Sequence, residues 1–390
     1  MSPRATGKTG GTRTLAAARR LVIKIGSALL VGELSGRLRH RWLASLCEDV
    51  AALRASGTEI VIVSSGAVAV GRNALKMGRG VLRLEEKQAA AAAGQIRLAH
   101  AYQEALARHK LPVAQILLTP ADTEERRRHL NARGTVETLL RLGVIPVINE
   151  NDSVATEEIR FGDNDRLAAR VAQMISADML VLLSDIDGLY TADPDRVKTA
   201  SFIPEVADIT PDIEAMAGDA APGYASGGMV TKIAAAKIAT RAGCSVVVAA
   251  GQKAHSLAAV GVRGRCTWFL PTSTPITARK QWIAGAVTLA GTITVDVGAA
   301  RALTQGKSLL PAGVTAIDGA FDRGDAVVIR TVGGKQIGSG LCAYAAADAR
   351  LILGHKTREI EALLGYRGRD EMIHRDDLVL DHARGCGKME

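Results

Sequence analysis

The chain has 390 residues, of which 47% are hydrophobic and only 3% aromatic, and its formal net charge is +9. This length predicts two domains, with cores built mainly from Ala, Val, Leu and Ile. No uncharged apolar run approaches the ~18 residues of a membrane span, and residues 1–19 are basic without the apolar stretch of a signal peptide. We therefore expect no membrane span and a disordered tail at 1–19. The positive charge fits either a nucleic acid or a small anionic substrate.

Five cysteines are scattered along the chain without a Cys-x-x-Cys pair. This pattern argues against a disulfide framework and against a zinc site, and it fits the reducing cytoplasm. The cysteines are Cys47, Cys244, Cys266, Cys342 and Cys386.

The first predicted strand, residues 21–26, carries a lysine near its end. Burial of Lys24 would be costly unless its ammonium meets an anion where the strand ends. The alternative is an edge-strand lysine that faces solvent. A predicted helix at 37–56 follows, with apolar residues at helical spacing.

The second predicted strand, 59–64, ends in Ser64-Ser65-Gly66. The segment from Gly66 to Asn73 approaches a phosphate-binding P-loop but lacks both its lysine and its Ser/Thr, so we reject that motif. A strand, a turn and a helix remain, whose amino terminus can hold a carboxylate or phosphate. Next come an Ala-rich helix at 85–109, a strand at 113–118 and a charged helical segment at 122–142.

The most informative stretch is an apolar run at 144–148 that ends in Asn149-Glu150-Asn151-Asp152. Residues 162–165 (Gly-Asp-Asn-Asp) then open a helical pattern that Asp163 or Asn164 can cap. Open α/β sheets bind ligands where strands end and helices begin. The alternative is a solvated loop followed by an ordinary cap.

Two further segments place polar groups where strands end or helices begin. The predicted strand 179–183 ends in Ser184-Asp185. The segment 223–232 precedes a helix that runs to about Arg241, in which Ser226 can serve as the cap. Its glycines let backbone N–H groups approach a phosphate. The alternative is a flexible loop before an ordinary amphipathic helix; a last strand follows at 245–250.

The alternation of strands and helices predicts a three-layer α/β/α sandwich with a mostly parallel sheet over 20–270. If the polar strand ends share one edge, they form a single cleft. Prolines and small polar residues predict a linker at 271–290, and short alternating strands predict a small β-rich domain at 291–370. Residues 371–390 are expected to be a C-terminal tail. The predicted strands of the β-rich domain are 292–296, 326–330 and 336–341.

The ordered set of motifs resembles the glutamate 5-kinase family, which has the amino-acid kinase fold and often a C-terminal PUA domain. The resemblance covers nearly everything after residue 20. The sequence departs from the family at two sites, with Ser27-Ala28 in place of the common Thr-Ser and Ala225-Ser226 in place of Gly-Thr. The serines keep the hydroxyl, so altered fit is expected, and Ala225 leaves the flexibility of its loop open. The motifs are Lys24–Ser27, Val63–Ala67, Val147–Asp152, Gly162–Asp165, Ser184-Asp185, Gly188–Thr191 and Ser226–Lys232, with Ser308–Gly313, Gly319–Asp325 and His374–Asp377 in the β-rich domain.

The resemblance implies ATP-dependent phosphorylation of the γ-carboxylate of L-glutamate, the first step of proline biosynthesis. It implies that Ser65, Asp152 and Asn164 bind glutamate. ATP would contact Lys24, Ser184, Asp185, Ser226, Gly227, Gly228, Met229, Val230, Thr231 and Lys232.

The residues fit this chemistry on independent grounds. A carboxylate acceptor is already ionised, so no general base is needed, which agrees with the lack of histidine at the strand ends. Catalysis then consists of positioning and charge neutralisation. We expect Lys24 and Lys232 to stabilise the transferring phosphoryl group, with Asp165, and also Asp185, holding the lysines. Mg²⁺ is expected to bridge the ATP phosphates, with no dedicated protein metal site.

The alternatives are a related kinase acting on aspartate, N-acetylglutamate, carbamate or a nucleoside monophosphate, and, in another class, an RNA-binding PUA protein. Scarce aromatic residues disfavour tight, sequence-specific RNA binding. The resemblance also implies a homo-oligomer in the cytoplasm, feedback inhibition by L-proline and hand-off of the product to glutamyl phosphate reductase.

Overall fold

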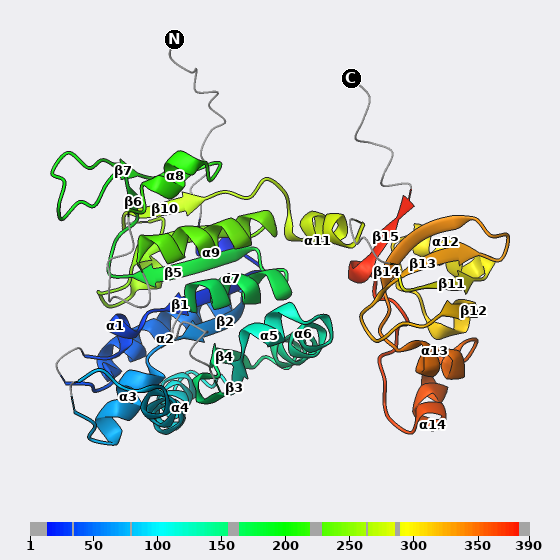
Figure 1. Ribbon diagram of the computed structural model, residues 1–390, viewed down its shortest axis with the longest axis horizontal. Helices are drawn as coiled ribbons and strands as arrows, with labels where there is room; N and C mark the ends of the chain where they lie inside the picture. Colours follow the sequence, from blue (N-terminus) through cyan, green and yellow to red (C-terminus); the bar gives the residue numbers. More distant parts are fainter. Residues whose placement is uncertain are drawn as a thin grey trace, which may run out of the picture. The chain divides into compact units, whose positions relative to one another are not determined.

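The computed structural model describes residues 14–32, 35–78, 80–154, 164–218, 228–262, 264–284 and 289–381. Contacts divide the chain into two compact units, which are described separately (Figure 1). The first comprises residues 1–124 and 131–275, and the second comprises 125–130 and 276–390.

An eight-stranded sheet forms the centre of the first unit, in the order β3-β4-β2-β1-β5-β9-β10-β8. The six strands from β3 to β9 are mutually parallel, which confirms the predicted mostly parallel sheet. Strand β10 is antiparallel to β9 and parallel to β8. The strands are β1 (Arg20–Ile25), β2 (Glu59–Ser64), β3 (Val113–Leu118), β4 (Ile145–Glu150), β5 (Met179–Ser184), β8 (Glu205–Val206), β9 (Ser245–Ala250) and β10 (Cys266–Phe269).

Helices cover both faces of this sheet (Figure 1). Leu21, Ile23 and Ile25 of β1 belong to one core, whereas Val22 belongs to the other, because successive strand residues point to opposite faces. A strand buried on both faces is apolar along most of its length. This explains why these strands could be predicted from the sequence. The first core includes α1 (Ser27–Leu30), α2 (His40–Ala55), α3 (Ala67–Ala74), α4 (Leu84–Ala107) and α10 (Ser256–Ala259); the second includes α6 (Arg126–Arg141), α7 (Asn164–Met174) and α9 (Met229–Arg241).

Shorter elements complete this unit. They are η1 (Leu15–Ala17), α5 (Pro120–Glu124), η2 (Asp152–Val154), the hairpin of β6 (Leu189–Tyr190) and β7 (Phe202–Ile203), and α8 (Pro211–Ala215).

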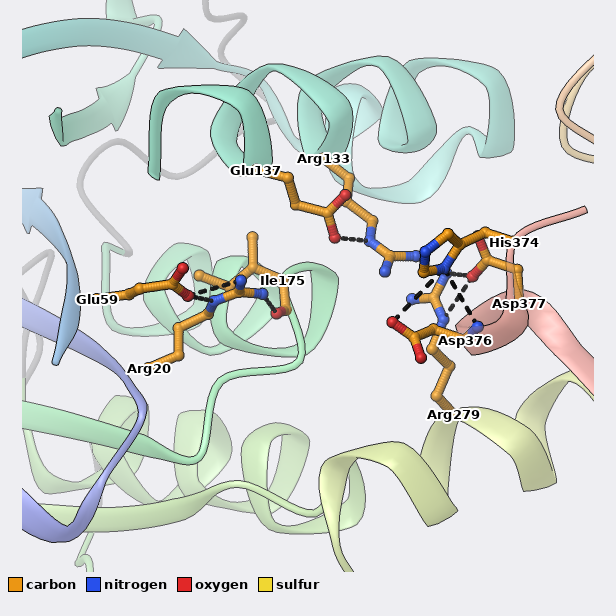
Figure 2. Close-up of polar contacts among 9 residues, drawn as sticks. All are labelled: Arg20, Glu59, Arg133, Glu137, Ile175, Arg279, His374, Asp376 and Asp377. Carbon is orange, nitrogen blue, oxygen red and sulfur yellow. Dashed lines mark hydrogen bonds and ion pairs between the residues drawn. The ribbon is translucent and has the colours of Figure 1, made fainter. Parts of the chain in front are cut away.

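Polar contacts also hold the edge where β1 begins (Figure 2). The Arg20 side chain donates to Glu59 at 2.8 Å and to the carbonyl of Ile175, and the Arg20 backbone N–H donates to Asp178 at 2.8 Å. These contacts join the starts of β1 and β2 to the end of α7, so the opposite, carboxyl edge of the sheet remains for ligands.

Helices α3 and α4 cross at two glycines. A Cβ on Gly71 would lie 1.7 Å from the Ala90 carbonyl oxygen, and one on Gly94 would lie 1.8 Å from that of Ala67. Only glycine allows the two backbones to approach this closely. The crossing therefore fixes the depth at which α4 lies on the sheet.

The second unit contains a five-stranded sheet in the order β12-β11-β13-β14-β15. Its three predicted strands are present as β11, β13 and β14. The elements are β11 (Gly291–Val295), α12 (Val297–Thr304), η3 (Pro311–Gly313), β12 (Val314–Gly319), β13 (Ala326–Thr331), β14 (Gln336–Leu341), α13 (Ala346–Ile352), η4 (Thr357–Glu359), α14 (Ile360–Leu364), η5 (Arg375–Asp377) and β15 (Leu378–Leu380).

Two segments differ from the sequence expectation. The predicted linker 271–290 contains helix α11 (Pro275–Ala284), whose Ile283 is buried against Ala326, Leu341 and Val379. The predicted tail 371–390 supplies β15, which pairs with β14. Arg279 of α11 donates to Asp377 at 2.8 Å (Figure 2), and both side chains are largely buried.

The predicted basic tail falls on residues 1–19, of which only 14–19 are among the described residues. Across the described parts of the chain, none of the helices combines the length and the apolar character that crossing a membrane requires.

Candidate active site

One carboxylate, Asp165, lies between two buried lysines at the carboxyl edge of the first sheet. Its Oδ1 is 2.6 Å from Lys24 Nζ, and its Oδ2 is 3.4 Å from Lys232 Nζ. The Thr231 hydroxyl donates to the same Oδ2 at 2.8 Å. The Asp165 side chain is only 1% exposed, so these partners replace its solvent.

Three elements bring this cluster together. Lys24 is the penultimate residue of β1, and Asp165 is in the first turn of α7. Thr231 and Lys232 are in the first turn of α9. Because strands end and helices begin at the same edge, groups more than 200 residues apart in sequence meet here.

The cluster carries two cations and one anion. Burial alone would raise the pKa of Asp165, but the charges of Lys24 and Lys232, with the hydrogen bonds from Lys24 and Thr231, hold it below its ordinary value. Burial lowers the pKa of Lys232 despite the opposing charge of Asp165, and the charge of Lys24 lowers it further. Asp165 therefore stays ionised between the two lysines. Buried ammonium groups at this edge of the sheet suit an anionic ligand.

A buried amide network lies beside the cluster. Asn164 Nδ2 donates to Ser65 Oγ at 2.7 Å, to Asn149 Oδ1 at 2.9 Å and, more weakly, to the Ser64 carbonyl at 3.3 Å. Asn149 Nδ2 in turn donates to Gln95 Oε1 at 2.8 Å. The network thus joins the ends of β2 and β4 to the start of α7 and to α4.

One atom of this network is unsatisfied. Within the parts of the chain that the structure describes, the buried Oδ1 of Asn164 has no hydrogen-bond partner. An unpaired buried acceptor carries a desolvation penalty unless a ligand supplies a donor. Asn164 is therefore placed to accept a hydrogen bond from a bound cation or N–H group.

Asp152 is a second buried carboxylate, at the start of η2 just after β4. Burial, aided by the negative charge of Glu150, raises its pKa to about 7. A cationic ligand would favour its ionised form. Asp152 and Asn164 therefore both suit an ammonium group.

The other predicted residues are distributed around the start of α9 and the end of β5. Ser184 Oγ donates to Asp185 Oδ1 at 2.8 Å, and the charge of the exposed Asp185 adds a small stabilisation of the Lys232 ammonium. Gly228 is the N-cap residue of α9, and Met229 and Val230 begin the helix. Ser226 and Gly227 lie outside the described residues, as do Gly162 and Asp163. The N-cap residue is Gly228, and the predicted capping role of Ser226 falls on a residue outside the described ones.

Sequence reasoning missed the contribution of α4. Gln95 reaches the amide network, and Tyr102 OH lies 2.9 Å from Ser64 Oγ. Both side chains are buried in an Ala-rich helix, where a single Gln or Tyr is not distinguished from an ordinary packing residue. The buried lysines around Asp165 suit an anionic ligand, and Asp152 and the Asn164 Oδ1 each suit an ammonium group, as in an enzyme site for an amino acid and an anionic co-substrate.

Comparisons with known proteins agree with this class of site. The model of the family described as "Amino acid kinase family" matches residues 19–250, and the model of the "PUA domain" matches residues 291–364. Glutamate 5-kinase from Paramagnetospirillum magneticum is 62% identical over 94% of this chain and 99% of its own length. The corresponding enzymes of Rhodospirillum rubrum and Agrobacterium fabrum are 61% and 58% identical, over 92% and 95% of this chain and 96% and 95% of their own lengths. The chain belongs to the amino acid kinase family and, within it, to the glutamate 5-kinases.

Proposed function

We propose that the site transfers the γ-phosphoryl group of ATP to the γ-carboxylate of L-glutamate, giving L-glutamyl 5-phosphate for proline biosynthesis. The observation that carries this proposal is the pair of buried lysines on either side of Asp165. The transferring phosphoryl group and the acceptor are both anionic, so their approach requires fixed positive charge.

The ATP side of the site is built around the start of α9. The N–H groups of its first turn donate no hydrogen bond to a side chain of the cap residue Gly228, because glycine has no side chain. A Cβ at Gly228 would meet no described atom within 4 Å, so the backbone is open to a phosphate. Lys24 and Lys232 supply charge, and Ser184 and Asp185 supply polar groups at the end of β5. Mg²⁺ that accompanies ATP would supply further charge neutralisation beside these residues.

The glutamate side of the site uses Asp152, Asn164 and Ser65. Asp152 and the unpaired Asn164 Oδ1 accept from the α-ammonium group, while Ser65 orients the Asn164 amide. The γ-carboxylate is ionised at neutral pH and attacks the γ-phosphorus directly. The bond to ADP breaks as the acyl phosphate forms, and Lys24 and Lys232 stabilise the charge on the transferred group.

The remaining proposals follow from membership of the family. We expect feedback inhibition by L-proline, self-association, a cytoplasmic location and hand-off of the labile acyl phosphate to glutamyl phosphate reductase. We do not propose RNA as a partner of this chain, since its aromatic content of 3% offers few stacking groups.

A substrate panel tests the choice of acceptor. ADP release with MgATP is measured for L-glutamate, L-aspartate, N-acetyl-L-glutamate, carbamate and UMP. We expect L-glutamate to have the highest kcat/KM by a wide margin. Among these acceptors, only L-glutamate has both a free α-ammonium group and a γ-carboxylate. A clear preference for any other acceptor would overturn the proposal.

A further inference from the structure

We propose that Gln95 of α4 is a positioning residue that makes the site selective for an acceptor with an α-amino group. Gln95 acts through Asn149, whose side chain sets the orientation of the Asn164 amide. This inference rests on the proposed binding of glutamate, and it adds a residue outside the predicted set of contacts.

The three amides form one buried chain. Gln95, Asn149 and Asn164 are 8%, 2% and 2% exposed, respectively. The Asn149 side chain lies between the other two, donating to Gln95 Oε1 at 2.8 Å and accepting from Asn164 Nδ2 at 2.9 Å. Shielding from water makes each of these bonds costly to leave unmade.

The direction of the chain is set at its Ser64 end. The Ser64 carbonyl can only accept, so Asn164 turns its Nδ2 toward it. Asn149 then offers its Oδ1 to Asn164 and turns its own Nδ2 away, toward the acceptor that Gln95 provides. Without that acceptor, the buried Asn149 Nδ2 loses its partner, and only the bond from Asn164 still favours this orientation.

The consequence is the unpaired acceptor in the site. With its Nδ2 engaged, Asn164 is left with a buried Oδ1 that no described group satisfies. An α-ammonium group supplies the missing donor. If Asn149 reversed its amide, Asn164 would lose an acceptor for its Nδ2, and its Oδ1 would no longer be held open for the substrate.

Helix α4 is anchored well enough to carry this role. Tyr102, about two helical turns beyond Gln95, contacts Ser64 Oγ through its hydroxyl, and it is fully buried. Gly94, directly before Gln95, is part of the close crossing with α3. The helix therefore presents Gln95 at a fixed depth behind the ends of β2 and β4.

The experiment compares L-glutamate with glutarate, the same dicarboxylate without an amino group, in full-length variants. Gln95→Met removes the acceptor at similar volume, and Gln95→Glu retains an acceptor oxygen in either protonation state. Gln103→Met, at an exposed position of the same helix, is the matched control. For each protein, KM and kcat are measured for both acceptors, together with KM for ATP.

We expect Gln95→Met to raise KM for L-glutamate about tenfold or more, with little change for glutarate or in KM for ATP. Selectivity for glutamate over glutarate should fall by the same factor. Gln95→Glu should restore most of it, and Gln103→Met should match wild type. Gln95→Asn, which withdraws the amide by one methylene, should reproduce the loss, and it decides the matter if Gln95→Met does not fold.

Unchanged selectivity in Gln95→Met or Gln95→Asn would overturn the proposal. So would an equal loss for both acceptors and for ATP, which indicates a purely structural role, or a failure of Gln95→Glu to improve on Gln95→Met. These outcomes are read against active wild-type enzyme. If wild type does not phosphorylate L-glutamate, the proposed function has failed instead.

Discussion

At the scale of single residues, the central feature is the sharing of Asp165 by Lys24 and Lys232. Its two carboxylate oxygens face one ammonium group each, at 2.6 Å from Lys24 and 3.4 Å from Lys232. Both buried lysines are thereby held at the carboxyl edge of the sheet, where an anionic ligand can meet them. The Thr231 hydroxyl oxygen lies 2.8 Å from both Asp165 Oδ2 and the Gly228 carbonyl oxygen, so its single hydrogen can bond either one, and it links this cluster to the start of α9.

Removal of one ammonium group tests this arrangement. We expect Lys232→Ala to lower kcat by on the order of a hundredfold or more, because charge stabilisation of the phosphoryl group is lost. Lys237→Ala is the control, since Lys237 is on the same helix but pairs with Glu214. Steady-state ADP release measures both. Turnover of Lys232→Ala within a few-fold of wild type would show that the lysine does not serve the reaction.

The buried Asp152 predicts a pH dependence. Its pKa is raised to about 7, so the free enzyme holds the carboxyl ionised only above that pH. An α-ammonium group binds the ionised form better. We therefore expect kcat/KM for L-glutamate to rise up to ~10-fold per pH unit below about pH 7 and then to level off. In Asp152→Asn, kcat/KM should be lower throughout and this limb should be flat.

The stability of the folded protein should fall with rising pH over the range in which activity rises. The folded protein keeps a proton on Asp152 that the unfolded chain releases near its ordinary pKa of 3.8, so this residue makes folding less favourable as pH rises from about 4 to about 7. The melting temperature should therefore fall between these pH values, and Asp152→Asn should remove the part of this fall that Asp152 causes. Identical pH profiles for the two proteins, in both activity and melting, would contradict the assignment.

At the scale of elements, the close crossing of α3 and α4 supports the amide network. We expect Gly94→Ala to lower stability by about 1–3 kcal/mol, because its new methyl group would overlap the Ala67 carbonyl and force the helices apart. Gly78→Ala is the control, since a Cβ there meets nothing within 4 Å. Thermal denaturation compares the two proteins. Equal melting temperatures would show that the two helices accommodate the added methyl group without strain.

The parallel strands and the long helices between them were predictable, whereas β10 and α11 were not. Strands such as β2 and β5 are buried on both faces, so each contains a continuous apolar run that ends in a serine. Strand β10 has only four residues, including the buried Thr267, which is too short for a pattern. Pro275 suggested a linker but is the first residue of α11, a position where proline favours a helix start.

Site residues were predictable where a polar or charged side chain lies at the end of a strand or at the start of a helix. Lys24, Asn164, Asp165 and Lys232 were predicted for this reason, and the structure brings them together. Gln95 was not, because a polar residue within a helix is compatible with a solvent-exposed face. Only its burial and its contact with Asn149 distinguish it.

At the scale of the whole molecule, the chain consists of two compact units. The described residues of the proposed catalytic cluster and of the amide network all belong to the first unit, which contains the match to the amino acid kinase family. The second contains the match to the PUA domain, with α11 and β15 completing its packing. The proposed phosphoryl transfer is thus assigned to residues of one unit.

The most direct measurement traps the acyl phosphate. Purified full-length protein is incubated with MgATP, L-glutamate and hydroxylamine, and γ-glutamyl hydroxamate is quantified beside ADP. We predict equal amounts of the two products, dependent on both substrates, with loss of both in Lys24→Ala and Lys232→Ala and lower yields in the presence of L-proline. ADP formation without hydroxamate, or undiminished hydroxamate formation in both lysine variants, would contradict the account.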